Sequence, residues 1–512
     1  MIRIGIDVGG TNTDAVLIEG GRVAAAVKTP TTPDVTGGIL EALARLTRTG
    51  VVAGKPVDAV MIGTTHFVNA VVQRRWLSRV GAIRIGMPAS ASLPPFCDWP
   101  DDLAGAVKGA VAMVEGGHDY DGRLFMPLDT AAIRRAARHM AEQGIRSVAI
   151  SAIFSPLDPS HEQTTAAIVA EEIPGAAVTC SSELGRIGLL ERENAALLNA
   201  ALADLARETV AAFERAIADS GLSAPLYITQ NDGTVAHADQ AMRLPVYSFA
   251  SGATNSMRGA AYLSGITDAM VTDVGGTTTD VGQIRRGFPR EANSVVKVGG
   301  VRTLFRMPDF LSIGLGGGSH VSLEPLSVGP LSVGYRLTED ALAFGGHELT
   351  ATDIGVAAGL IAIGDPARVA HLDRATCVRV LERIRGLLEE SIDRMKTEAA
   401  EVVLLAVGGG AFLVPERLEG VSRVLRVPHG DCANAVGAAI AQVSGEVDQV
   451  FRDMTREAAL AAAENLAAER AVAAGADPAT LSVVDTEDIP IAYLPGNARR
   501  VRVRCVGDVA GK

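Results

Sequence analysis

One eight-residue segment occurs twice in this chain and constrains its fold more than any other feature. Residues Asp7–Asp14 read DVGGTNTD and residues Asp273–Asp280 read DVGGTTTD, so seven of eight letters agree at a constant offset of 266 residues. A short apolar run precedes each copy, another follows it, and a glycine turn comes next. Apolar runs on both sides of a glycine-rich turn predict a β-hairpin. The sequence therefore predicts two copies of a hairpin with an unusual loop.

The loop of each hairpin has the composition of an anion-binding site. Adjacent glycines let the backbone approach a ligand, and successive N–H groups can then form a concave nest for phosphate. The aspartate before the glycines repels phosphate, so its position makes sense if a hydrated Mg²⁺ lies between the two. Two such loops facing each other would hold a triphosphate from both sides. The alternative is a pair of structural turns, which the second copy disfavours.

Three other segments are candidates for ligand contact. Residues 63–65 (Gly-Thr-Thr) join a predicted strand to a helix start, where anions bind readily. His66 follows and could be a base or a metal ligand, although a lone histidine is more often structural. Residues 312–319 form a second glycine-rich loop. Strand 402–407 runs into a triple glycine before a predicted helix, as an adenosine pocket requires, because base and ribose pack against bare backbone. The glycines of these two loops are Gly316, Gly317, Gly318, Gly408, Gly409 and Gly410.

Helix predictions around these loops complete the outline. Residues 186–219 carry a continuous apolar stripe, which predicts one long helix. Residues 251–256 are small and polar, and we expect a loop there that opens a helix over 257–263. The small residues of 433–439 permit close contact between two helices.

Composition narrows the class of protein. The chain has 512 residues, enough for several domains, and its 48% hydrophobic and 21% charged residues are typical of globular proteins. A net charge of −12 argues against a nucleic-acid surface. Five cysteines without a CxxC pair disfavour a disulfide framework and a zinc ribbon. The first strand begins at once, which leaves no room for a signal peptide, and no apolar run is long enough for a membrane span. We expect a cytoplasmic protein.

Two phosphate hairpins far apart in the sequence resemble the actin / sugar-kinase / Hsp70 ATPase superfamily. The resemblance implies an α/β fold with two actin-like (ribonuclease H-like) lobes and a nucleotide cleft between them. We expect a first lobe at residues 1–265 that contains an inserted substrate region. A second lobe at 266–450 carries the glycine-rich adenosine loops, and a small C-terminal α+β appendage occupies 451–512.

Within that superfamily, the order of motifs resembles the hydantoinase A / oxoprolinase family over residues 3 to about 445. The family usually has histidine directly before Gly-Thr-Thr, whereas this chain has Ile62 there and His66 just after. The resemblance implies ATP-dependent ring opening of a cyclic amide such as a hydantoin, 5-oxoproline or a lactam, with Mg²⁺ or Mn²⁺. It also implies a second hydantoinase-type subunit, and we expect a homo-oligomer. The matching segments are 5–14, 63–65 with 69–70, 182–184, 191–193, 232–233, 273–280 and 313–319.

The resemblance also implies roles for the hairpin residues. Asp7 and Asp273 would hold Mg²⁺ through water, and Asp14 or Asp280 could orient metal or water. Phosphorylation of the amide oxygen would give an imidate phosphate that water attacks readily, while the protein supplies positioning and charge neutralisation. The residues expected to cradle the phosphates are Gly9, Gly10, Thr11, Asn12, Thr13, Gly275, Gly276, Thr277, Thr278 and Thr279.

Two other functions remain open at this level. A small-molecule kinase would use the same loops and release a phosphorylated product. A switching ATPase would turn over ATP without a small-molecule substrate. Activators of dehydratases fit poorly, because they need cysteines placed for an iron–sulfur cluster.

Overall fold

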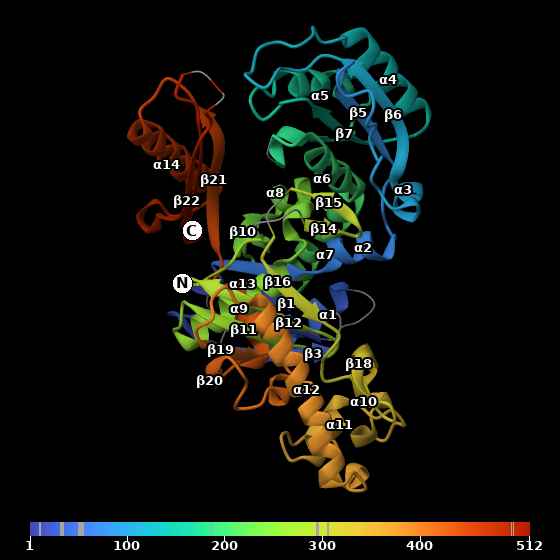
Figure 1. The fold of residues 1–512 in the computed structure, drawn as a ribbon, viewed down its shortest axis with the longest axis vertical. Coiled ribbons are helices and arrows are strands. Elements are labelled where there is room, and N and C mark those ends of the chain that lie inside the picture. The colour runs from blue at the N-terminus through green and yellow to red at the C-terminus, as the bar shows by residue number, and fades with distance from the viewer. Residues whose placement is uncertain are drawn as a thin grey trace.

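The computed structural model consists of two lobes, an inserted domain and a C-terminal unit that stand along one long axis (Figure 1). It describes residues 1–9, 12–30, 35–49, 56–185, 187–292, 296–304, 307–492, 494 and 496–511.

The first lobe is built on a mixed sheet with strand order β22-β23-β21-β10-β9-β4-β1-β2-β3. Strands β1, β4 and β9 run parallel, and β1, β2 and β3 form the antiparallel meander that the first hairpin begins. Strand β1 is buried along its whole length, and Ile4 and Ile6 pack in one core with helices α1 and α7. The elements are β1 Ile2–Val8, β2 Asn12–Glu19, β3 Arg22–Pro30, α1 Val35–Arg48, β4 Ala59–Thr64, α2 His66–Gln73, α7 Ala203–Asp219, β9 Leu226–Thr229, β10 Thr234–His237 and α8 Ala238–Arg243.

The second lobe repeats the centre of the first on a smaller sheet with order β13-β12-β11-β19-β20, and β16 also pairs with β12. Strand β11 pairs antiparallel with β12 and parallel with β19, just as β1 pairs with β2 and β4. The sequence repeat is therefore a structural repeat. The elements are β11 Ala269–Val274, β12 Thr279–Arg285, β13 Phe288–Pro289, β14 Val296–Val298, β15 Val301–Thr303, β16 Phe310–Ile313, β17 Ser319–Leu323, β18 Leu326–Ser332, α10 Leu337–Asp340, α11 Ala351–Ala357, α12 Arg374–Met395, β19 Val402–Val407 and β20 Val421–Arg426.

A separate four-stranded sheet, β6-β5-β7-β8, forms the inserted domain between α2 and α7. The prediction of one helix over 186–219 was wrong, because the chain turns at Leu202 and forms α6 and α7 instead. Buried apolar side chains continue through that turn, so hydrophobic periodicity alone could not locate it. The elements are β5 Val80–Met87, α3 Asp101–Val107, β6 Lys108–Glu115, α4 Thr130–Glu142, β7 Ser147–Ala152, α5 Ser160–Glu172, β8 Ala177–Cys180 and α6 Leu189–Ala201.

The C-terminal unit extends the sheet of the first lobe although it lies at the far end of the sequence. Strand β21 (Gln442–Phe451) pairs parallel with β10 and antiparallel with β23 (Arg499–Gly507), and β22 (Ser482–Pro490) forms the edge. Helix α14 (Arg456–Ala473) covers these strands with a row of buried alanines. In Figure 1 the unit and the inserted domain rise on the same side of the first lobe. Across the described residues, none of the helices is both long and apolar enough for a membrane crossing.

Candidate nucleotide site

The two predicted hairpins are closed by equivalent backbone hydrogen bonds. The Gly9 amide donates to the Asn12 carbonyl at 3.0 Å, and the Gly275 amide donates to the Thr278 carbonyl at 2.9 Å. In the first copy Asp7 lies opposite Asp14 across the strands, and in the second Asp273 lies opposite Asp280. Each hairpin therefore carries a pair of carboxylates beside its glycine turn.

Helices α9 (Ser251–Ser264) and α13 (Ala433–Ala439) cross between the lobes in direct backbone contact. A Cβ at Gly259 would lie 1.8 Å from the Ala433 carbonyl oxygen, and one at Gly437 would lie 1.8 Å from the Asn255 oxygen. Gly259 thus packs on the residue four positions before Gly437, and Gly437 packs on the residue four positions before Gly259. The expected loop at 251–256 is instead the first part of α9, since its small side chains are what this close packing requires.

Each of these two helices donates one hydrogen bond to the first aspartate of a hairpin. Asn434 Nδ2 donates to Asp7 Oδ2 at 2.8 Å, and Ser256 Oγ donates to Asp273 Oδ2 at 2.5 Å. Ser256 and Asn434 each lie three residues before the contact glycine of their helix, so they occupy equivalent positions. The sequence analysis missed both donors, and the common spacing to Gly259 and Gly437 is the signal that could have found them.

Burial raises the pKa of all four hairpin carboxylates. Burial raises the pKa of Asp7 to about 7, and the charges of Asp14 and Asp273 add to the shift. Burial likewise raises the pKa of Asp280 to about 7, against a hydrogen bond from Ser312, with a further contribution from Asp273. Because the charge of Asp273 adds to the pKa shift of Asp7, the two carboxylates lie near each other although they belong to different lobes.

The second aspartate of the first hairpin differs, because it has a cationic partner. Lys28 Nζ lies 2.5 Å from Asp14 Oδ1 and also donates to the Asp431 carbonyl at 3.2 Å. Burial still raises the pKa of Asp14, and Lys28 opposes that shift. Asp14 is thus neutralised within the protein, which fits a structural position better than direct contact with a ligand.

The site meets the chemical requirements of a hydrated divalent cation between acids and phosphates. Asp7 Oδ1 is buried and has no hydrogen-bond partner among the described residues. In that same part of the chain, no group of three or more acidic, histidine or cysteine side chains is placed to enclose a metal ion. Mg²⁺ keeps several waters and often takes only one or two carboxylates together with substrate phosphates. Asp7 and Asp273 match that requirement.

The tips of the hairpins divide into exposed and buried positions. Thr277 and Thr278 are exposed beside Gly276, where a ligand could reach them. Thr13 and Thr279 are fully buried in their strands, and the Thr279 hydroxyl donates to the Leu315 carbonyl at 2.6 Å. Thr279 therefore holds the hairpin rather than a ligand. Gly10 and Thr11 lie outside the described residues.

The loop at Gly316, Gly317 and Gly318 supports the second hairpin from behind. The Gly317 amide donates to the Gly275 carbonyl at 2.9 Å, and the Gly318 amide donates to the Gly276 carbonyl at 2.7 Å. The Gly316 amide donates to Ser319 Oγ at 2.8 Å. The predicted contact between these glycines and nucleotide is revised, because all three amides are already bonded within the protein and the glycines are buried.

Two other predicted segments lie beside the hairpins. Gly408 adopts φ +87°, and a Cβ there would lie 2.3 Å from Asp273 Oδ1, so this turn passes directly under the acid. Gly410 is buried, with its amide donating to the Val274 carbonyl at 2.7 Å, and Gly409 is exposed. A short 3₁₀ turn (Ala411–Leu413) follows in place of the predicted helix.

His66 begins α2, two residues after Thr64, which pairs with Val8 beside the first hairpin. Its ring stacks on Trp76 at a centroid distance of 5.8 Å, and burial lowers its pKa. A neutral imidazole is therefore present near the site, turned toward an aromatic neighbour.

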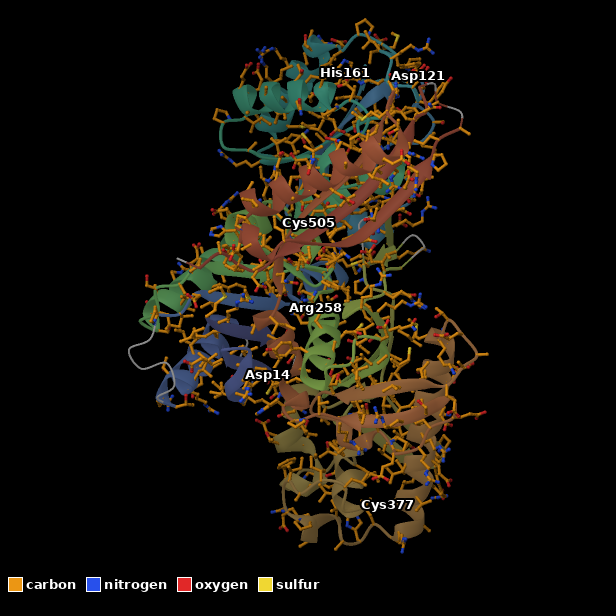
Figure 2. All side chains as sticks on the ribbon, turned by 90° about the vertical axis from the view of Figure 1, so that its left-hand side faces the viewer. Asp14, Asp121, His161, Arg258, Cys377 and Cys505 are labelled. Carbon is orange, nitrogen blue, oxygen red and sulfur yellow. The ribbon has the colours of Figure 1, made fainter. Side chains whose placement is uncertain are left out.

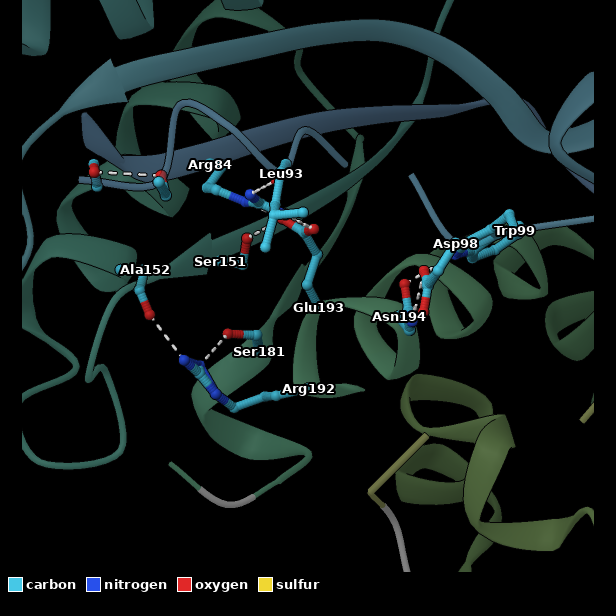
Figure 3. Close-up of polar contacts among 12 residues, drawn as sticks. Arg84, Leu93, Asp98, Trp99, Ser151, Ala152, Ser181, Arg192, Glu193 and Asn194 are labelled. Carbon is cyan, nitrogen blue, oxygen red and sulfur yellow. Dashed lines mark hydrogen bonds and ion pairs between the residues drawn. The ribbon is translucent and has the colours of Figure 1, made fainter. Parts of the chain in front are cut away.

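The charged residues Arg192 and Glu193 have a structural explanation in the inserted domain (Figure 3). Arg84 is fully buried and its Nε donates to Glu193 at 2.8 Å, while Ser151 Oγ donates to the same carboxylate at 2.6 Å. Arg192 donates to Ser181 Oγ at 2.9 Å and to the Ala152 carbonyl at 2.7 Å. These pairs fasten α6 to the inserted sheet.

Comparisons with known proteins agree with this architecture. The family model for the hydantoinase/oxoprolinase N-terminal region matches residues 3–173, and the hydantoinase/oxoprolinase model matches residues 192–401. Caprolactamase subunit alpha of Pseudomonas jessenii is 26% identical over 79% of this chain and 61% of its own length. The gamma subunit of acetophenone carboxylase from Aromatoleum aromaticum is 25% identical over 88% of this chain and 69% of its own length.

Two solved structures share the fold. The ATP-dependent caprolactamase from Pseudomonas jessenii superimposes with a TM-score of 0.77 at 22% identity, covering 99% of this chain and 88% of that chain. Nucleotide-free acetone carboxylase gives a TM-score of 0.69 at 17% identity with the same coverage. The expected fold class of two actin-like lobes with a C-terminal α+β unit is confirmed. With matches to both of its models, the chain belongs to the hydantoinase/oxoprolinase family.

Proposed function

We propose that this protein opens a cyclic amide in a reaction driven by ATP hydrolysis. The observation that carries the proposal is the pair Asp7 and Asp273. Each lies beside a glycine turn, each accepts a hydrogen bond from a helix between the lobes, and burial raises the pKa of both. The relative that is named a caprolactamase supports a lactam-like substrate, although this chain spans only 61% of that relative's length.

The proposed chemistry starts from the weak electrophilicity of an amide carbonyl. Its oxygen attacks the γ-phosphorus and ADP leaves, so the ring carbon becomes an imidate phosphate. Water adds to that carbon, the ring C–N bond breaks, and a second water releases inorganic phosphate. Overall, one ring and one ATP consume two waters.

The side chains of this chain supply position and charge balance for that sequence. The exposed tip residues Thr277 and Thr278 would contact phosphate oxygens, and Asp7 and Asp273 would hold Mg²⁺ through water. Mg²⁺ would offset the negative charge of the phosphates during transfer. Asn434 and Ser256 hold the two carboxylates in place through hydrogen bonds, so the carboxylates need not move before the reaction.

The relatives' printed names also bear on assembly. Both curated relatives are subunits of larger enzymes, which supports our proposal that this chain works with a second hydantoinase-type subunit.

The proposal is tested by following ADP release and ring-opened product together, with Mg²⁺ and a panel of hydantoins, 5-oxoproline and lactams. We expect equal amounts of both products, lost in Asp273→Ala and retained in Asp393→Ala, an exposed acid of the same lobe. A stable phosphorylated product would identify a kinase instead. ATP turnover that ignores every ring would identify a switching ATPase.

A further inference from the structure

His66 lies at the rim of the space beside Asp7. Asp7 pairs with Gly63 in the parallel register of β1 and β4. A Cβ at Gly63 would lie 2.7 Å from Asp7 Oδ1 and 2.5 Å from Asn255 Nδ2, so the carboxylate and helix α9 meet over this glycine. His66 follows Gly63 by three residues, and three residues span at most about 11 Å of chain. The imidazole is therefore attached to the strand end that carries the nucleotide site.

The backbone around His66 is fixed by the start of α9. The Ser251 hydroxyl donates to the Thr64 carbonyl at 3.3 Å, and the backbone amide of His66 donates to Thr64 Oγ1 at 3.1 Å. A Cβ at Gly252 would lie 3.6 Å from the methyl group of Thr65. The end of β4, the start of α2 and the start of α9 thus form one corner, and His66 belongs to it.

The His66 imidazole differs from the other histidine side chains in having no polar partner although it is half-buried. Within the described ranges, neither of its ring nitrogens has a hydrogen-bond or ion-pair partner. Five histidines do have such a partner, namely His118, His139, His161, His237 and His320. Three are exposed to solvent, namely His347, His371 and His429. In Figure 2, the partnered His161 lies in the inserted domain, well apart from Asp14 of the first hairpin. A positioned imidazole with both nitrogens uncommitted can exchange a proton with a bound reactant.

Trp76 gives the imidazole its orientation. The two rings are stacked with centroids 5.8 Å apart and 28° between their planes, while Phe67 meets the imidazole edge-on at 6.5 Å. Trp76 is 61% exposed and has φ 55°, a backbone conformation that bulky residues rarely adopt. An exposed tryptophan in this conformation adds little to a core. Its contact with His66 is the better explanation for its position.

The surroundings of His66 keep its imidazole neutral. Burial lowers its pKa, and in the described part of the chain no charged group contributes to the shift. Helix α2 packs against a 3₁₀ turn that carries Tyr247 and against β14, which carries Lys297. At the end of α2, Arg74 is paired with Asp102 at 2.9 Å. At pH 7 the imidazole therefore has a lone pair on one nitrogen and can accept a proton.

We infer that His66 accepts a proton from the water that attacks the phosphorylated ring carbon, and that Trp76 positions the imidazole for this step. This role depends on the proposed function of the site. As the water oxygen bonds to the carbon, one water proton passes to the imidazole. When the ring C–N bond breaks, its electron pair goes to the nitrogen, which takes that proton from the imidazolium. The new hydroxyl loses its proton to solvent as the carbonyl re-forms. The resulting acyl phosphate is cleaved by the second water, and His66 is neutral again.

The test separates phosphoryl transfer from water attack with ATP that carries heavy oxygen in the bridge between its β and γ phosphates. Reversible transfer to the ring moves this label to a nonbridging β oxygen each time ATP re-forms. Hydantoin, 5-oxoproline and δ-valerolactam are the probes, with Mg²⁺. In His66→Gln we expect ring opening to fall about 100-fold, while ring-dependent isotope exchange persists. The matched control is His371→Gln, an exposed histidine of the second lobe, which should behave as wild type does.

The pH profile of ring opening tests the contribution of Trp76. In wild type, the rate should fall at acidic pH as His66 takes up a proton, and the residual rate of His66→Gln should lack this fall. Trp76→Leu exposes the imidazole, so its pKa should rise and the fall should begin at higher pH. Trp76→Phe keeps an aromatic neighbour and should restore the wild-type profile. Melting temperatures check the fold of each variant.

The outcomes distinguish this role from the proposed function. Normal ring opening in His66→Gln, or loss of isotope exchange together with ring opening, would overturn the role of His66 while wild-type turnover sustains the proposed function. An unchanged profile in Trp76→Leu would overturn the positioning role of Trp76. Wild-type protein that gives neither exchange nor ring-opened product with any probe would count against the proposed function and, with it, this role of His66.

Discussion

The two hairpins have almost the same sequence and the same turn, yet the protein surrounds them differently. In the first, the closing acid Asp14 pairs with Lys28. In the second, burial raises the pKa of the closing acid Asp280 to about 7, and a hydrogen bond with Ser312 opposes that shift. The second hairpin also rests on the loop Gly316–Gly318, through two backbone hydrogen bonds.

This difference separates the hairpin residues that have partners within the protein from those that could contact a ligand. The first aspartates, Asp7 and Asp273, keep equivalent surroundings, since each receives one donor from a helix between the lobes. The closing aspartates have diverged, one into an ion pair and one into a titratable group. The surroundings of the two hairpins are alike at the first aspartates, where the hairpins approach each other. This similarity is what we expect if one ligand binds between the hairpins.

The largest expected effect comes from the equivalent pair. Asp7→Asn and Asp273→Asn should each lower ATP turnover by about 10²–10³-fold, as removal of one preorganised electrostatic group does. The double variant should lose little more, because the two carboxylates act as one unit. Steady-state kcat/KM for ATP measures this, with Asp393→Asn as the control. A loss confined to one of the two would show that the pair is not equivalent in function.

The support behind the second hairpin gives the next largest effect. A Cβ at Gly316 would lie 2.6 Å from the Thr277 nitrogen and 2.8 Å from the Gly275 oxygen. Backbone atoms cannot yield as a flexible side chain can, so we expect Gly316→Ala to lower the free energy of unfolding by about 3 kcal/mol.

Gly409 provides the matched control for that substitution. Among the described residues, a Cβ at Gly409 would meet no atom within 4 Å. Urea unfolding should therefore give the same midpoint for Gly409→Ala as for wild type. Equal midpoints for Gly316→Ala and Gly409→Ala would contradict the supporting role of the loop.

The sequence was enough to predict the two repeated hairpins, because a glycine turn between two apolar runs is a local signal. The actin-like fold class came from the resemblance to a known superfamily. The sequence could not separate glycines that contact a ligand from those that support a loop. Gly316 and Gly409 look alike in sequence, and only the packing of β16 and β17 on the hairpin distinguishes them. Ser256 and Asn434 were missed for a related reason, since their role depends on contact between helices 169 or more residues apart in sequence.

The C-terminal strands illustrate the same limit. We expected a small α+β appendage at 451–512 from the sequence, but β21 begins at Gln442 and pairs with β10, about two hundred residues earlier in the chain. Residue patterns report which face of a strand is buried, not which distant strand lies beside it. The cavity of about 600 Å³ that Gln230 and Ser444 help to line therefore could not be predicted from the sequence.

Removing the cation of the first hairpin would make the two closing acids alike. Lys28→Met leaves Asp14 buried without its ion-pair partner, and the pKa of the carboxyl should rise further. We expect a loss of about 1–2 kcal/mol in the free energy of unfolding at pH 8, and a smaller loss at pH 5. Lys28→Arg, which keeps the charge, is the control. A loss that does not change with pH would argue against the ion pair as its cause.

The pH dependence of stability probes Asp280 directly. Its pKa is about 7 in the folded protein and 3.8 in an unconstrained chain, so between these values the folded state binds more protons than the unfolded state. The free energy of unfolding should therefore fall as pH rises from about 4 to 7, by at most about 1.4 kcal/mol per pH unit for this group. Asp7 contributes a second slope of the same sign.

Asp280→Asn should remove the contribution of Asp280 to the pH dependence of the free energy of unfolding and leave the contribution of Asp7. The variant should therefore be more stable than wild type at pH 8 and similar at pH 4. Urea unfolding across this range measures both slopes. Asp14→Asn is the informative contrast, because it leaves Lys28 unpaired and should not stabilise the protein at pH 8. Stabilisation by both substitutions would show that burial of the ionised carboxylate costs the same free energy in both hairpins, and that the ion pair with Lys28 does not offset this cost at Asp14.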